Sequence, residues 1–152
     1  MRETLIAILA GVLLGSPFVA PRRAAAAEPA ARVRFETLEV FVDSGGQALA
    51  AYQFELAAEV GEVKIAGVEG GEHPAFKSPP YYDPAALSRN RIIIAAFNTG
   101  RDLPRGRTRV ARLHLYVSGD KAPEYAVRLE AAGNAEGQRI PATVTVRKGE
   151  MK

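Results

Sequence analysis

The 152-residue chain has no cysteine, no tryptophan and only two histidines. Without cysteine it has no disulfide, no thiolate nucleophile, no Cys-ligated metal centre and no acylated cysteine to anchor a lipoprotein. The two histidines, His73 and His114, have no third ligand at the spacing of a metal site, so no zinc site is predicted. These absences remove many of the side chains that enzymes use.

Sequence motifs of catalysis are also missing. The chain has no Gly-Xaa-Ser-Xaa-Gly elbow, no glycine-rich phosphate loop and no Gly-Xaa-Gly-Xaa-Xaa-Gly. Thirteen glutamates and four aspartates leave a carboxylate pair for glycoside hydrolysis open, although solvated surface carboxylates are the simpler interpretation. A calcium site in the turns would draw on aspartates that lack clustered spacing: Asp43, Asp83, Asp102 and Asp120. We expect no enzymatic activity, no metal and no cofactor.

The N-terminus has the layout of a secretory signal. Arg2 precedes an apolar run over residues 5–14, and residues 24–27 offer Ala-Xaa-Ala cleavage sites. The apolar segment 5–20 contains a proline and is shorter than the roughly 20 residues that span a bilayer. An uncleaved membrane anchor therefore stays the alternative to a removed leader.

We expect a signal peptide over residues 1–27, a flexible lead-in over 28–32 and one folded domain over 33–148, in a protein that is secreted, periplasmic or at the cell surface. Removal of the leader lowers the net charge from +3 to +1. The mature protein is then nearly neutral, so its charge does not favour a nucleic-acid partner.

Beyond residue 33, hydrophobic residues recur at every second position, which is the period of a strand with one buried face. Residues 92–97 are apolar at both parities, which predicts a central strand covered on both faces. A phase slip at Gly67 predicts a bulge, and Pro141 places the last strand near a sheet edge. We expect an all-β protein, an antiparallel β-sandwich of about seven to nine strands. The alternating sets are Leu38, Val40 and Val42; Tyr52, Phe54 and Leu56; Val63 and Ile65; Ala111, Leu113, Leu115 and Val117; Tyr125, Val127 and Leu129; and Ile140, Ala142, Val144 and Val146.

The longest stretch without a strand pattern is residues 70–90, and loops of that length are more often functional than idle. One helical turn is predicted within it at residues 83–87, with an aspartate cap followed by proline. Tyr81 and Tyr82 are expected to be exposed, where they would stack on a sugar or anchor a protein. Phe76 either joins them or covers the end of the sandwich.

Charge is unevenly distributed along the chain. Residues 35–72 hold eight acidic residues and one basic residue, a local charge of −7, whereas residues 89–112 hold seven arginines and one acid, a local charge of +6. One interpretation is that opposite charges pair across the sheet. The other is an exposed basic strip suited to acidic polysaccharide or an acidic protein, formed by Arg105, Arg107, Arg109, Arg112, His114 and Tyr116.

Four segments resemble strands of the cohesin family: residues 49–56 (LAAYQFEL), 63–71 (VKIAGVEGG), 92–98 (IIIAAFN) and 109–115 (RVARLHL). The resemblance covers about residues 33–117. It implies a nine-stranded jelly-roll sandwich, extracellular and without catalytic activity, that binds a dockerin-type partner. The chain departs from the family pattern because its Tyr-Asp-Pro segment, residues 82–84, does not directly follow the second strand.

Two functions follow as alternatives. The first is an exported, non-catalytic module for protein–protein interaction, as the resemblance implies. The second is a carbohydrate-binding module that uses the loop tyrosines and the arginine strip to hold a polysaccharide. The missing tryptophan argues against a flat platform for crystalline cellulose.

Overall fold

The computed structural model describes residues 32–150. The expected signal peptide, residues 1–27, and most of the lead-in lie outside the described residues. Within residues 32–150, none of the helical segments is long and apolar enough to cross a membrane.

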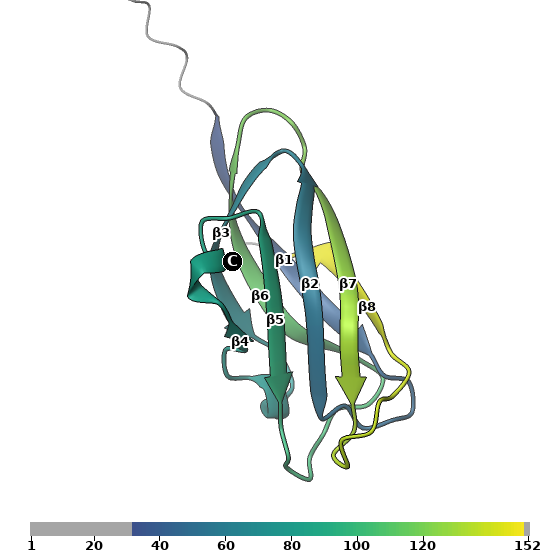
Figure 1. Cartoon of the computed structure of the whole chain (residues 1–152). Helices are drawn as coiled ribbons and strands as arrows, with labels where there is room; N and C mark the ends of the chain where they lie inside the picture. The colour runs from purple at the N-terminus through teal and green to yellow at the C-terminus, as the bar shows by residue number, and fades with distance from the viewer. Residues whose placement is uncertain (1–31, 151–152) are drawn as a thin grey trace, which may run out of the picture. The chain divides into compact units, whose positions relative to one another are not determined.

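Eight strands form two antiparallel four-stranded sheets (Figure 1). Sheet A has the order β3-β6-β1-β8, and sheet B has the order β4-β5-β2-β7. The expected all-β, antiparallel architecture is confirmed. The strands are β1 (Val33–Asp43), β2 (Ala51–Val60), β3 (Glu62–Gly70), β4 (Tyr81–Tyr82), β5 (Arg91–Phe97), β6 (Arg107–Ser118), β7 (Glu124–Gly133) and β8 (Thr143–Lys148), with 3-10 turns η1 (Pro74–Phe76) and η2 (Pro84–Ala86).

The core lies between the two sheets and consists of the residues that alternate in the sequence. Leu38 of β1 and Leu113 of β6 come from sheet A, and Phe54 of β2 and Ile94 of β5 come from sheet B. None of these four side chains is more than 1% exposed. Complete burial of such a side chain contributes roughly 1.5–3 kcal/mol, so the period-two pattern supplies much of the drive to fold.

Two local predictions from the sequence are also confirmed. The pairing of β3 with β6 shifts register between Ile65 and Gly67, where the bulge was expected. The last strand, β8, follows Pro141 and lies at the edge of sheet A.

The prediction that residues 92–97 are covered on both faces is wrong. Ile92 and Ile94 are buried, whereas Ile93 is 46% exposed and Phe97 is 66% exposed. β5 is an inner strand of sheet B, but no described segment forms a third layer over the outer face of this sheet. Its outward apolar side chains therefore face solvent.

The segment 70–90 is not free of strand, as the sequence pattern suggested. Tyr81 and Tyr82 form β4 and pair with Ala95 and Ile94 of β5. The predicted helical turn is confirmed as η2, because the Asp83 carboxylate accepts a hydrogen bond from the Ala85 amide at 2.9 Å.

Prolines flank β4 on both sides: Pro79 and Pro80 precede it and Pro84 follows it within two residues. Proline has no amide hydrogen to donate to a neighbouring strand. This local sequence restricts β4 to two residues and turns the chain away from β5 at Asp83.

Candidate functional site

Three exposed apolar side chains gather on the outer face of sheet B, and we call Tyr81, Ile93 and Phe97 the Tyr81 patch. Tyr81 is 68% exposed, and its ring lies nearly parallel to that of Phe97, with centroids 6.0 Å apart and planes at 11°. Ile93 points to the same face, two residues before Ala95, the partner of Tyr81. These are three of the five large hydrophobic side chains that are exposed in the described chain.

Small side chains form the floor of this face beside the Tyr81 patch. Cross-strand pairing places Ala95 between Tyr81 and Gln53, and Gln53 pairs with Ala131 on the other side. Because alanine is short, the side chains at positions 95 and 131 do not screen the two rings. The outward alanines of β2, β5 and β7 are Ala51, Ala57, Ala95, Ala126 and Ala131.

Charged residues bound the apolar area along β2 and β7. The Glu55 carboxylate accepts a hydrogen bond from Arg91 and lies 3.8 Å from a guanidinium nitrogen of Arg128. Arg128 in turn pairs with Glu130 at 2.6 Å. The hydrogen bond from Arg91 lowers the pKa of Glu55, so this carboxylate is ionised at neutral pH.

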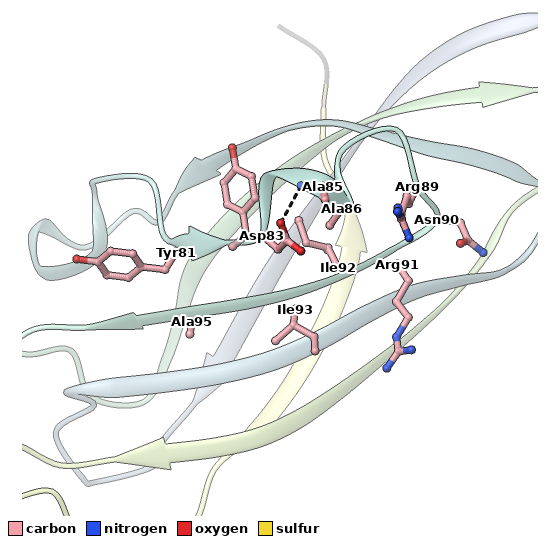
Figure 2. Close-up of a pocket in the computed structure, with 11 residues that line it drawn as sticks. Tyr81, Asp83, Ala85, Ala86, Arg89, Asn90, Arg91, Ile92, Ile93 and Ala95 are labelled. Carbon is pink, nitrogen blue, oxygen red and sulfur yellow. Dashed lines mark hydrogen bonds between the residues drawn. The ribbon is translucent and has the colours of Figure 1, made fainter.

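A groove of about 680 Å³ lies next to the Tyr81 patch, and we call it the β5 groove (Figure 2). Figure 2 shows η2 on one side of it and β5 on the other. Its lining is mixed, with apolar side chains along β5 and charged side chains where β5 begins. It is lined by Tyr81, Tyr82, Asp83, Ala85, Ala86, Arg89, Asn90, Arg91, Ile92, Ile93 and Ala95.

Of the three predicted loop aromatics, only Tyr81 presents its ring to solvent. Tyr82 is half-buried against the core, since neighbouring residues of a strand point to opposite faces. Phe76 is 3% exposed and packs edge-on against Tyr52 at 5.1 Å, so it covers the end of the sandwich and is not a surface contact. Phe97 and Ile93 were not identified as site residues from the sequence. The signal that could have found them is that the odd-numbered positions of the 92–97 run, which share one face of the strand, are also apolar.

The predicted arginine strip lies on the outer face of sheet A, around one carboxylate. The Glu39 side chain is only 8% exposed. It accepts hydrogen bonds from Arg112 and Arg147, each at 2.8 Å, and Arg109 lies 3.7 Å away. The hydrogen bond from Arg112, helped by Arg147, holds the pKa of Glu39 below its ordinary value, while burial acts in the opposite direction.

The remaining members of the strip also have partners within the protein. His114 contacts Glu69 at 2.8 Å, Arg105 donates to the Gly46 carbonyl, and the Arg107 guanidinium lies 3.6 Å above the Phe41 ring. Tyr116 packs edge-on against Phe35, with centroids 5.7 Å apart. Arg109, Arg112 and His114 thus pair with acids of neighbouring strands, as the first interpretation of the charge pattern held.

Over residues 32–150 no three His, Cys, Asp or Glu side chains come close enough to hold a metal ion. His73 accepts a hydrogen bond from the Ala75 amide and so caps η1, which is a structural role.

No family model, curated protein or solved structure matches the chain. The resemblance to the cohesin family therefore rests on the four quoted segments alone. What defines the protein is its all-β architecture of two antiparallel four-stranded sheets. An architecture of this kind hosts many functions, so the Tyr81 patch and its surroundings indicate the function better than the fold does.

Proposed function

We propose that the protein is an exported, non-catalytic binding module with a cohesin-like jelly-roll fold, and that it docks a partner protein on the Tyr81 patch. The observation that carries the proposal is the exposure of Tyr81, Phe97 and Ile93 together on an alanine floor. Contiguous exposed apolar surface with a polar rim is typical of interaction sites, and aromatic residues are enriched at the centre of such sites.

The character of the surface favours a protein over a sugar as the ligand. The floor residues beside the rings are alanines, which offer no side-chain hydrogen bonds, together with Gln53. Asn134 and Arg139 are the further polar side chains that line the hollow containing Tyr81 and Phe97. A polysaccharide needs donors and acceptors around the rings for its hydroxyl groups, because buried polar groups without partners are costly. A partner protein with apolar side chains at its centre meets this surface without that cost.

Polysaccharide binding is the second candidate, and one observation favours it. The rings of Tyr81 and Phe97 are nearly parallel, and each is about two-thirds exposed. Neighbouring aromatic rings can stack on successive apolar faces of a sugar chain. The exported location expected from the N-terminal sequence suits both ligands.

The test uses a double variant, Tyr81→Ala with Phe97→Ala, and a matched control, Phe35→Ala. Phe35 is 58% exposed but lies on sheet A. A secreted protein captured by the wild type is identified by mass spectrometry, and its Kd is measured for all three chains. We expect the double variant to bind at least about tenfold more weakly and the control to bind normally, because central aromatics dominate interfaces.

The same three chains are run in gels that contain polysaccharide. Retardation of the wild type and the control, but not of the double variant, without any protein partner would support the second candidate. Equal protein binding by the double variant and the wild type would refute docking on the Tyr81 patch.

A further inference from the structure

β4 leaves part of β5 without a neighbouring strand. The β4 pairs are Tyr81 with Ala95 and Tyr82 with Ile94, and the chain then turns away at Asp83. β5 continues to Arg91, three residues further along this edge. Within the described residues, no backbone hydrogen bond joins residues 91–93 to η2 or to its flanking turns.

The β5 groove lies along this unpaired edge. Its far wall is η2, whose residues toward the groove include Ala85 and Ala86 (Figure 2). Their small side chains keep the groove open. A strand edge with unpaired amide and carbonyl groups is a ready template for another extended chain.

We propose that the β5 groove binds an extended peptide segment of the partner protein, which continues β4 and pairs with β5 at residues 91–93. The inference rests on the proposed function, since it specifies how the partner engages the same side of sheet B. Strand addition of this type draws its affinity from backbone hydrogen bonds and its specificity from alternate side chains.

The groove also specifies which side chains the peptide carries. A peptide that runs in the direction of β4 meets Ile93, then Ile92, then Arg91. The first two positions lie beside apolar side chains, of which Ile92 is buried and Ile93 is 46% exposed.

The third position lies at the basic end of the groove, beside Arg91 and Arg89. Arg91 already pairs with Glu55, whereas Arg89 is exposed and has no ion pair within the described residues. Asp83 also lines the groove, and its carboxylate accepts a hydrogen bond from the Ala85 amide. An acidic residue in the peptide complements this end, so the expected pattern is apolar, apolar, acidic.

The probe is a capped heptapeptide, Thr-Thr-Val-Val-Glu-Thr-Thr, titrated into the full 15N-labelled chain. We expect amide shifts at residues 91–93 and around η2, and slower hydrogen exchange of the Arg91 and Ile93 amides, which face the groove because the even-numbered residues of β5 bond toward β2. Absence of shifts at residues 91–93 at millimolar peptide would overturn strand addition.

Peptides N-methylated at alternate positions separate backbone pairing from side-chain docking. In a strand, amides of alternate residues point to the same edge, so one N-methylated set removes the donors that face β5 and the other leaves them. We expect the first set to lose binding and the second to retain it. Equal binding by both sets would overturn the proposal.

Reversing the charge of the peptide or of the groove tests the expected acidic residue at the third peptide position. The wild type should prefer the glutamate peptide over its lysine counterpart by about fivefold, as expected for exposed ion pairs, and Arg89→Glu should reverse that preference. No preference in either chain would overturn the acidic assignment. Loss of partner binding by the Tyr81 and Phe97 double variant, combined with failure of every peptide, would overturn strand addition while the proposed function stands.

Discussion

Glu39→Gln tests whether the Glu39 carboxylate stabilises the arginine strip. The Glu39 carboxylate is 8% exposed at the centre of the outer face of sheet A, and three arginines, from β6 and β8, surround it. The substitution keeps the size of the side chain but removes its charge. Arg109, Arg112 and Arg147 then face one another without an anion between them.

The expected loss of stability follows from how deeply Glu39 and its arginine partners are buried. Removing one partner of a buried ion pair costs about 3–5 kcal/mol, because it leaves the other charge uncompensated. Here the Arg112 side chain is 28% exposed and the Arg147 side chain is 62% exposed, so water compensates part of that loss. We expect Glu39→Gln to lower the free energy of unfolding by about 2 kcal/mol at pH 7.

The pH dependence has a defined sign. The arginines lower the pKa of Glu39 in the folded state, so its contribution is present above the unfolded-state pKa of about 4.3. The contribution is lost as pH falls through the lower folded-state pKa. The difference in stability between the wild type and Glu39→Gln should therefore shrink below about pH 4.

The assay is urea denaturation followed by tyrosine fluorescence at several pH values. The matched control is Glu69→Gln, which removes a carboxylate that is 55% exposed on the same face and should change stability by less than about 1 kcal/mol. Glu36 and Glu55 also have lowered pKa values, so the difference between variant and wild type is the quantity to follow. Equal stability of Glu39→Gln and wild type at pH 7, or a difference that does not change with pH, would refute the reasoning.

Three other substitutions test the fold around the site. Phe76→Ala should lower the free energy of unfolding, measured by urea denaturation, by about 3 kcal/mol, because the ring is buried in the core. A decrease of less than about 1 kcal/mol would indicate that Phe76 lies at the surface. Gly70→Ala should prevent stable folding, judged by circular dichroism, since its Cβ would lie 2.1 Å from the Lys77 carbonyl oxygen; Gly46→Ala, with nothing within 4 Å, is the control. Tyr125→Phe should raise the urea midpoint, with a gain of about 1 kcal/mol, because the buried Tyr125 hydroxyl has no hydrogen-bond partner within the described residues; a loss would indicate a bound partner for that hydroxyl.

Local features of the fold were predictable because their causes are local. The alternation around Leu113 and Leu115 reports which face of β6 is buried, whatever the neighbouring strands are. The slip at Gly67 marks a bulge, and Asp83 followed by proline marks a helical turn. Each of these needs only a few adjacent residues to be recognised.

The candidate site depends on contacts that the sequence does not express locally. Ile93 and Phe97 are exposed because no described segment forms a third layer over sheet B. The apolar run would have the same sequence if such a layer were present, so the sequence does not distinguish the two structures. Glu39 and Arg147 are 108 residues apart and meet because β1 pairs with β8 in one register. Pairing of that kind is decided by the whole sheet.

Hydroxyl-radical footprinting tests docking on sheet B most directly. The full chain is oxidised alone and in the presence of the identified partner, and the modification of each aromatic side chain is quantified by mass spectrometry. We expect Tyr81 and Phe97 to react readily in the free protein and to be protected in the complex, while Phe35 on sheet A reacts equally in both. Protection of Phe35 with Tyr81 and Phe97 still reactive would contradict docking on the outer face of sheet B.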